Sequence, residues 1–401
     1  MENRYDKYKD SGIAWIGNIP EHWEVKKLGH LYIPRNEKVS DKDYPALSVT
    51  MQGVLLQLEN VAKTNDGDNR KLVKIGDFAI NSRSDRRGSC GISKYDGSVS
   101  LINIVLTPIN DMNPVYYEWL FHSSLFSDEY YRWGHGIVND LWTTRWQEMK
   151  NIQIAAPPLH EQQLIATYLD QKCSEIDELI TLQEEMITKL QSYKQSVITE
   201  AVTKGLDKNV PLKDSGIEWI GEIPEHWKIT KIQYLAQLKS GYNLTTEEIK
   251  DSGLYPVYGG NGIRGYYDKY FLEGDYVLIG RQGALCGNIN YSTGKSWATE
   301  HAVVCYPKTK YITKWFGELL RVMNLNQYSL AAAQSGLAVE RIKLLPIPII
   351  PLSEQQTIAN YLDQKCSEID ELISIKQQKI EKLKDYKKSL IFECVTGKRK
   401  V

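Results

Sequence analysis

The chain has 401 residues, of which 42% are hydrophobic and 25% are charged, and its formal net charge at pH 7 is -1. This length exceeds what one hydrophobic core usually supports, and the balanced charge argues against a protein that binds polyanions over its whole surface. No apolar segment follows a basic N-terminus, and the most apolar run, residues 344–352, is interrupted by Pro346, Pro348 and Pro351. We therefore expect a cytoplasmic protein of two or three domains with no membrane span.

The cysteines form no CxxC pair and no Cys/His spacing that would build a zinc site, so no metal is expected. Cys173 and Cys366 occupy equivalent places in a repeated segment. We expect both to be small buried residues with an apolar role.

Two pairs of segments in the chain are nearly identical. LHEQQLIATYLDQKCSEIDELI at 159–180 returns as LSEQQTIANYLDQKCSEIDELI at 352–373. KDSGIAWIGNIPEHW at 9–23, the first strap, returns as KDSGIEWIGEIPEHW at 213–227, the second strap. The chain therefore contains two copies of a strap, a variable region and a helix, and the strap and helix that repeat are here called the frame. Each strap is expected to dock aromatic side chains onto a neighbouring element.

The repeated helix carries the 4-3 spacing of apolar residues that is typical of a coiled coil. The residues predicted to pair the helices are Leu169, Ile176, Ile180, Ile187 and Leu190 in the first copy, and Leu362, Ile369, Ile373, Ile380 and Leu383 in the second. Polar residues interrupt both seams at the same places, and we interpret Gln183/Lys376 and Lys194/Lys387 as marks of register. One helix cannot bury such a seam alone, so we predict that the copies pair antiparallel about a pseudo-two-fold axis, with the variable domains at opposite ends.

The variable regions predict mixed α/β domains with curled sheets. In the first, short β-branched runs at 46–49, 78–81 and 98–105 indicate strands, and 116–131 indicates a helix. In the second, strands are expected at 276–279 and 298–306. The overall fold is therefore predicted to be α+β, with a first domain at 1–155, a first helix at 156–205, a second domain at 206–350 and a second helix at 351–401.

Motifs that carry catalysis are missing from the sequence. It contains no GxSxG, HExxH or Walker motif, no GxGxxG after a strand, and no Asn/Asp-Pro-Pro-aromatic motif of an amino-methyltransferase. The histidines are scattered, which favours structural roles over a metal site. We expect a chain that is not itself an enzyme.

Basic and polar residues gather in the first variable region. The loop AINSRSDRRGSCG at 79–91 gives the DNA-binding candidates Asn81, Arg83, Arg86, Arg87 and Ser89, and an aromatic-basic cluster further on gives Arg132 and Arg145. Arginine forks suit guanine edges and phosphates, and asparagine suits adenine. The alternative for the loop is a solvated turn with an internal salt bridge to Asp85, and the tryptophans of the second cluster are better explained by core packing.

Glycine, tyrosine and amide residues are frequent in the second variable region. The candidates for DNA contact there are Tyr258, Asn261, Arg264, Arg281, Gln282, Lys295, Thr299 and His301. Glycine-rich turns allow the backbone to approach a ligand closely. The alternative is an array of glycine-rich turns without a partner.

The straps AWIGNIPEHW and EWIGEIPEHW, the helix starts PPLHEQQLIATYLDQK and IPLSEQQTIANYLDQK, and the turns INSRSDRRGSCG and YGGNGIRGYYDKY together resemble the specificity subunit of type I restriction-modification enzymes. The resemblance extends over essentially the whole chain. It implies two target recognition domains, each reading one half of a split double-stranded DNA site, on helices that dock two modification (methyltransferase) subunits and restriction subunits. It further implies that S-adenosylmethionine, ATP and Mg²⁺ are used by those partners, with no cofactor in this chain.

Unlike domains on a two-fold frame predict an asymmetric bipartite site, and a rigid rod between them predicts an unread spacer of fixed length. A coiled-coil scaffold that joins two proteins without touching nucleic acid is the alternative function. A fused methyltransferase-specificity protein is disfavoured because no glycine motif for the cofactor is present.

Overall fold

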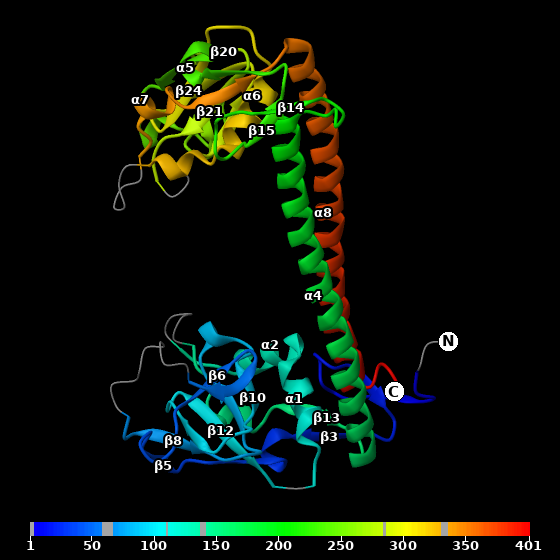
Figure 1. Ribbon diagram of the computed structural model, residues 1–401. Coiled ribbons are helices and arrows are strands. Elements are labelled where there is room, and N and C mark those ends of the chain that lie inside the picture. The colour runs from blue at the N-terminus through cyan, green and yellow to red at the C-terminus, as the bar shows by residue number, and fades with distance from the viewer. Residues whose placement is uncertain (1–3, 58–66, 110, 137–141, 284–285, 330–335) are drawn as a thin grey trace. The chain divides into compact units, whose positions relative to one another are not determined.

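The computed structural model describes residues 4–57, 67–109, 111–136, 142–283, 286–329 and 336–401 (Figure 1). The chain divides into two compact units. Unit 1 consists of residues 1–184 and 377–401, and unit 2 consists of residues 185–376. Each unit contains one variable region, one strap, the first part of one long helix and the last part of the other.

Unit 1 is built on small antiparallel sheets. The main sheet has the order β10 (Cys90–Ile92), β9 (Phe78–Asn81), β12 (Asn103–Pro108) and β4 (Tyr32–Pro34). Beside it are β11 (Gly97–Val99), β8 (Arg70–Val73) and β5 (Lys38–Val39), and a hairpin of β6 (Leu47–Thr50) and β7 (Gly53–Leu56). Two further pairs hold the frame: β1 (Tyr8–Asp10) with β2 (Asn18–Pro20), and β3 (Glu24–Lys27) with β13 (Gln153–Ala156).

Three helices complete unit 1: α1 (Pro114–His122), α2 (Ser124–Arg132) and α3 (Trp146–Met149). The single helix predicted at 116–131 is wrong, because the chain breaks at Ser123. This residue is extended (φ -66°, ψ 140°), and its hydroxyl accepts a hydrogen bond from the backbone N–H of Phe126 at 3.3 Å. A serine cap of this kind ends one helix and begins the next. The strand predicted at 98–105 likewise divides into β11 and β12, with a turn closed by the bond from Asn103 N–H to Ser100 O.

Unit 2 has the same frame with different sheets. One sheet has the order β17 (Ala236–Ser240), β24 (Ala302–Pro307), β21 (Tyr276–Gly280) and β22 (Ile289–Ser292); the other has the order β19 (Gly262–Tyr267), β18 (Tyr255–Gly259), β23 (Lys295–Ala298) and β20 (Leu272–Glu273). The strap pair is β14 (Leu212–Asp214) with β15 (Glu222–Pro224), and the closing pair is β16 (Lys228–Lys231) with β25 (Pro346–Ile349). The helices are α5 (Ile232–Leu235), α6 (Thr313–Val322) and α7 (Val339–Ile342). The strand predicted at 298–306 is divided, since residues 299–301 form a turn between β23 and β24.

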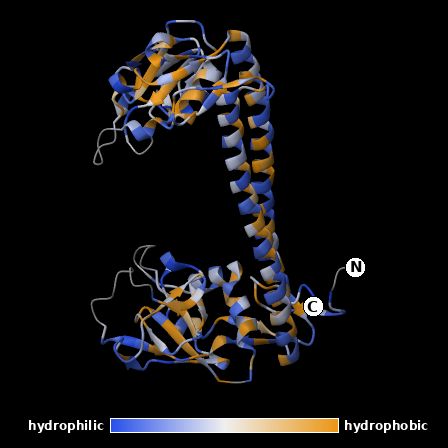
Figure 2. Cartoon of the chain, viewed as in Figure 1, coloured by the Kyte–Doolittle hydropathy of each residue, from blue (hydrophilic) through white to orange (hydrophobic). Residues whose placement is uncertain are grey.

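The two long helices begin after prolines, as expected: α4 (Leu159–Lys204) follows Pro158, and α8 (Leu352–Val395) follows Pro351. In each unit the first part of one helix packs antiparallel against the last part of the other, which confirms the predicted pairing. The residues proposed for the seam are all buried or half-buried. Along both helices, apolar positions alternate with polar ones in the hydropathy colouring of Figure 2.

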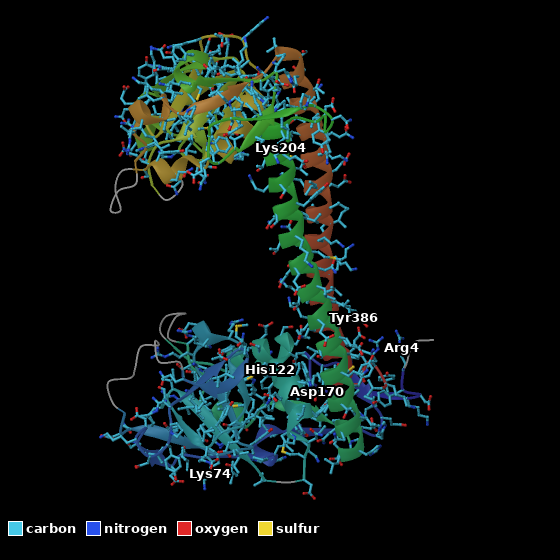
Figure 3. All side chains as sticks on the ribbon, viewed as in Figure 1. Arg4, Lys74, His122, Asp170, Lys204 and Tyr386 are labelled. Carbon is cyan, nitrogen blue, oxygen red and sulfur yellow. The ribbon has the colours of Figure 1, made fainter. Side chains whose placement is uncertain are left out.

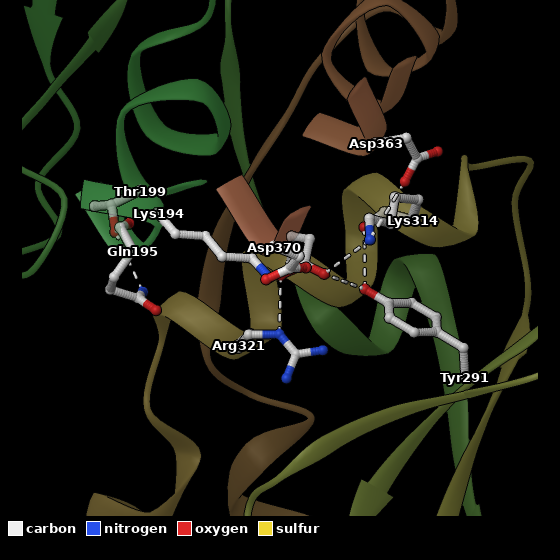
Figure 4. Close-up of polar contacts among 9 residues, drawn as sticks. Lys194, Gln195, Thr199, Tyr291, Lys314, Arg321, Asp363 and Asp370 are labelled. Carbon is white, nitrogen blue, oxygen red and sulfur yellow. Dashed lines mark hydrogen bonds and ion pairs between the residues drawn. The ribbon is translucent and has the colours of Figure 1, made fainter. Parts of the chain in front are cut away.

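An equivalent ion pair joins the helices in each unit. Lys387 Nζ lies 2.6 Å from Asp177 Oδ2 in unit 1, and Lys194 Nζ lies 2.6 Å from Asp370 Oδ2 in unit 2 (Figure 4). Both lysines interrupt the apolar seam, and both aspartates belong to the repeated segment. The other pair of polar residues that interrupts the seam is Gln183, which is buried, and Lys376, which is half-buried.

Each strap is fixed to a long helix through a buried tryptophan. In unit 1, Trp23 Nε1 donates to Glu161 Oε2 at 3.0 Å, and His22 and Tyr5 bind the same carboxylate at 2.5 and 2.8 Å. In unit 2, Trp227 Nε1 donates to Glu354 at 3.0 Å, and His226 binds it as well. The straps therefore dock aromatic side chains onto the helix starts, as the sequence predicts.

The glutamine that follows each of these glutamates connects the long helix to the variable domain of the same unit. Gln162 accepts from the backbone N–H of Asn113 at 2.9 Å and donates to Pro157 O at 2.8 Å. Gln355 makes the same pair of bonds, with Ile312 N–H at 2.9 Å and Ile350 O at 3.0 Å. The residues that these glutamines contact differ between the units. In both units, however, the glutamine accepts from one backbone N–H and donates to one backbone carbonyl.

A third repeated residue contacts the main helix of each domain. Asp170, labelled in Figure 3, accepts from Trp119 Nε1 of α1 at 2.8 Å. Its equivalent, Asp363, lies 3.3 Å from Lys314 Nζ of α6 (Figure 4). The near-identity of the repeated segments thus follows from contacts that place two different domains on the same frame.

Candidate nucleic-acid interface

The arginine-rich loop of unit 1 is paired with the segment before α3. Ser84 N–H donates to Trp142 O, and Thr144 N–H donates to Ser82 O, both at 3.0 Å. Arg83 forms a β-bridge with Thr143. These two segments, 82–84 and 142–144, bring the candidates of the loop and those of the aromatic-basic cluster together.

A cavity of about 650 Å³, here called the carboxylate-lined cavity, opens on one side of this pairing. Its lining residues are Ser84, Asp85, Arg87, Asp128, Tyr131, Arg132 and Trp142. Arg87 Nη1 lies 3.1 Å from Asp128 Oδ1, with its guanidinium 5.3 Å from the centre of the Tyr131 ring. Arg132 is paired with Glu129 at 2.9 Å. The positive charges here are therefore largely balanced within the protein.

A second cavity, of about 330 Å³, contains Arg83 and Arg145 together with Lys71, and is here called the basic cavity. No carboxylate is among its lining residues, which also include Asn36, Asn103 and Trp146. Lys71 Nζ donates to Asn103 O at 2.7 Å, and burial lowers the pKa of its ammonium group. Lys71 was not among the sequence candidates, since a single lysine in a strand carries no distinguishing pattern.

The remaining candidates of unit 1 have different places. Asn81 and Ser89 are buried and shape the loop: Asn81 Oδ1 accepts from Arg83 N–H at 3.0 Å, and Asn81 N–H donates to Ser89 O at 2.9 Å. Arg86 is exposed, and its Nε lies 3.9 Å from Asp85 Oδ2. This is the internal salt bridge expected if the loop at 79–91 is a solvated turn.

In unit 2, three loops meet at one end of the sheets: the β18–β19 turn, the β21–β22 loop and the β23–β24 loop. Asn288 Nδ2 donates to Asn261 Oδ1 at 2.7 Å, and His301 Nδ1 lies 2.9 Å from Gln282 Oε1. A Cβ added at Gly260 would be 3.2 Å from His301 O, so the hairpin turn lies directly against the neighbouring loop. Asn261, Gln282 and His301 are therefore neighbours.

The other candidates of unit 2 have different places, and the backbone N–H of Arg281 donates to His301 O at 2.8 Å. Arg281 is half-buried and donates to Ser240 Oγ at 3.1 Å, while the stem of Arg264 covers Gly259. Tyr258 and Thr299 are buried, and Lys295 lies at the opposite end of β23 from Thr299, with its ammonium 4.6 Å from the Tyr270 ring centre. Residues 284–285 of the turn RQGALCGN lie outside the described residues.

Asn288 was not among the sequence candidates. It follows Gly287, which has φ +87° and packs against the backbone of Asn326. A Gly-Asn dipeptide in a loop is a signal for a tight turn, and it is the signal that could have identified this residue.

Among the described residues, no group of three or more His, Cys, Asp or Glu side chains is arranged to hold a metal ion. Cys173 and Cys366 are buried and unpaired, as expected. In the same part of the chain, no helix has the length and apolar character needed to cross a membrane.

Comparison with known families decides what this duplicated frame is. A model of the type I restriction modification DNA specificity domain matches residues 20–191 and, a second time, residues 224–385. The chain belongs to the type I restriction-modification specificity family. The repeated match agrees with the duplication seen in the sequence.

Relatives of this specificity-family chain carry the same description. Over 134 residues it is 40% identical to the type I restriction enzyme EcoprrI specificity subunit of Escherichia coli, a match that covers 32% of this chain and 33% of that protein. It is 24% identical to the type I restriction enzyme MjaVIII specificity subunit of Methanocaldococcus jannaschii, with 96% of this chain and 94% of that protein covered. The chain thus spans a third of the first relative and nearly all of the second.

Two solved structures share the fold of this specificity-family chain. The HsdS subunit from Thermoanaerobacter tengcongensis matches with a TM-score of 0.56 at 15% identity, over 94% of this chain and 98% of that one. A chain from a structure titled "Structural basis underlying complex assembly and conformational transition of the type I R-M system" matches with a TM-score of 0.74 at 15% identity and the same coverage. At this identity the similarity establishes the fold alone.

Proposed function

We propose that this chain recognises a bipartite, asymmetric site in double-stranded DNA, with unit 1 reading one half and unit 2 the other. The observation that supports this most directly is one frame carrying two unlike surfaces. The frame contacts of Glu161 and Glu354 are equivalent, as are those of Gln162 and Gln355. The loops that these contacts position differ in length, sequence and sheet topology.

The chemistry of the two surfaces favours different base edges. Unit 1 presents guanidinium groups, which can donate two parallel hydrogen bonds to guanine or to phosphate oxygens. Unit 2 presents the amides of Asn261, Asn288 and Gln282 beside His301. Amide side chains match the donor and acceptor pair of adenine in the major groove. Unlike surfaces of this kind would select unlike half-sites.

The outer faces of the long helices are the proposed docking surface for two modification subunits. Leu179 and Leu182 in unit 1 are 43% and 51% exposed, and their equivalents in unit 2, Leu372 and Ile375, are 46% and 51% exposed. Exposed apolar residues on a helix are typical of a protein contact. Because the duplication repeats this face, each unit would bind one modification subunit in the same manner, and restriction subunits would join through them.

We infer that this chain supplies no catalytic group, because its relatives are described as specificity subunits and its own sequence carries no methyltransferase or nucleotide-binding motif. S-adenosylmethionine, ATP and Mg²⁺ would then be bound by the partner subunits. A DNA-directed role of this kind would be carried out in the cytoplasm, where the chromosome is accessible.

Domain exchange tests the proposal. Residues 26–155 are replaced by the corresponding region of another specificity subunit, the chimaera is expressed with its modification subunits, and the methylated motif is determined by sequencing genomic DNA. We expect one half of the motif to change and the other to remain. The matched control replaces residues 228–350 and should change the other half. A methylated motif that stays the same in both exchanges would refute the assignment, and a complex that retains no DNA would favour a protein scaffold.

A further inference from the structure

The basic cavity of unit 1 contains three cationic side chains that no carboxylate of the described residues neutralises. Lys71 comes from β8, Arg83 from the loop after β9, and Arg145 from the residue before α3, so distant parts of the sequence converge on one concave surface. No carboxylate lines the cavity, and none of the described carboxylates forms an ion pair with any of the three. Like charges gathered in this way repel one another, and an anion placed among them would relieve that repulsion.

Lys71 strengthens the case for an anion. Its side chain is half-buried, and burial lowers the pKa of its ammonium group. The bond to Asn103 O satisfies one N–H donor but supplies no negative charge. A partly desolvated cation of this kind gains more from an incoming anion than a fully hydrated surface lysine does.

The carboxylate-lined cavity on the other side of the same loop provides the contrast. There Arg87 is already paired with Asp128, and Arg132 with Glu129. An anion entering that cavity would meet Asp85 and Asp128 as well as the arginines. The distribution of carboxylates therefore selects the basic cavity as the anion site.

We propose that the basic cavity binds a backbone phosphodiester group of one DNA strand, as a contact that positions unit 1 on the duplex without reading a base. Arginine forks fit phosphate oxygens, and Trp146, Leu101 and Ile102 in the wall supply apolar surface for the adjoining sugar. The proposal rests on the proposed function and adds a sequence-independent site to it. Lys71, Arg83 and Arg145 would then set affinity, while other side chains set sequence preference.

The test measures binding of a fluorescent random-sequence duplex to the full chain over a series of salt concentrations. The variants are Arg83→Gln/Arg145→Gln, and the same pair combined with Lys71→Gln. Each neutralised phosphate contributes about one unit to the slope of log K against log salt. We expect the triple variant to bind on the order of tenfold more weakly at low salt, with a slope shallower by about one, and equally so for different duplex sequences.

The control is Lys74→Gln, since Lys74, labelled in Figure 3, is an exposed lysine of the same unit. Lys74 precedes β9, whereas Arg83 follows β9. This control removes one positive charge at the opposite end of β9 and should leave the slope unchanged. Arg83 and Arg145 are exposed, so the double variant should keep the wild-type circular dichroism spectrum while already weakening binding.

The outcomes separate the two proposals. If the wild-type chain retains DNA and the triple variant keeps its affinity and slope, the phosphodiester site is refuted and the proposed function stands. If the wild-type chain retains no random-sequence duplex at all, the phosphodiester site is refuted, and the domain exchange decides the proposed function. A changed preference among duplex sequences at an unchanged slope would make the cavity a base-reading site instead. Binding of labelled ATP that the triple variant loses, with duplex affinity intact, would assign the cavity to a free nucleotide and refute the backbone contact.

Discussion

Removing the carboxylate of Glu161 should loosen the first strap and leave the second unaffected. Trp23 is fully buried, so Glu161→Ala leaves its indole N–H without an acceptor, which costs about 1–3 kcal/mol. Loss of the bond from the Tyr5 hydroxyl adds about 1 kcal/mol. His22 is 48% exposed and can be rehydrated, so its contribution is small. We expect local destabilisation of about 2–4 kcal/mol.

Hydrogen exchange followed by mass spectrometry measures this effect strap by strap. A loss of 2–4 kcal/mol corresponds to exchange that is roughly 30- to 1,000-fold faster in residues 9–23. Glu354→Ala should do the same to residues 213–227, by a smaller factor, because among the described residues Glu354 binds only Trp227 and His226.

The duplication supplies the controls for this experiment. Glu21→Ala, in the same strap but exposed, should change exchange little. Wild-type protection of residues 9–23 in Glu161→Ala, or equal acceleration of both straps, would show that the carboxylate does not hold the strap.

Three further outcomes are expected. Leu169→Ala should lower the free energy of unfolding by about 2–5 kcal/mol, because Leu169 is fully buried in the seam. Leu182→Ala, on the exposed face, should change this free energy by about 0.5 kcal/mol or less. Urea titrations followed by circular dichroism measure both variants. A double-mutant cycle on Lys194 and Asp370 should give a coupling below about 1 kcal/mol that weakens with added salt, since both side chains are partly exposed; a salt-insensitive coupling above this value would contradict the reasoning. Burial alone would raise the pKa of the Glu161 carboxyl, but hydrogen bonds from its three partners lower this pKa below its usual value. The carboxylate therefore stabilises the fold above the pKa of the unfolded chain, about 4.3, and this stabilisation is lost as the pH falls through the pKa of the folded chain. The exchange rates of wild type and Glu161→Ala, each corrected for intrinsic exchange, should therefore converge in acid, and a gap that widens there would contradict the sign.

The frame of this protein was predictable because it is repeated. Two copies of a helix with the same apolar spacing reveal both the seam and its partner, and two copies of a tryptophan-rich strap reveal a docking element. The structure also explains why some polar residues are the same in both copies of the helix. Glu161, Gln162 and Asp170 each contact a residue of the frame or of the domain that the frame carries.

The surfaces that the frame carries were less predictable. Residue type pointed to the loop at 79–91, but it could not show that Asn81 would be buried while Arg83 is exposed, because the direction of each side chain depends on the pairing of 82–84 with 142–144. Lys71 lies in a strand far from that loop in sequence, and only the folded chain places it in the same cavity. The break at Ser123 was missed because the apolar pattern continues through it.

The discontinuity of unit 1 has a consequence for synthesis on the ribosome. Leu390, Ile391, Cys394 and Val395 belong to the buried cluster that contains Trp23 and Tyr116, and the Tyr116 hydroxyl donates to Val395 O at 3.0 Å. Unit 2 is continuous from 185 to 376. At a translation rate of about 5–20 residues per second, the N-terminal part of unit 1 waits about 10 to 40 seconds for the residues that close its core. The domain that is translated first is therefore the last whose core can be completed, and a nascent chain that stops before residue 377 leaves its first recognition domain with an open hydrophobic core.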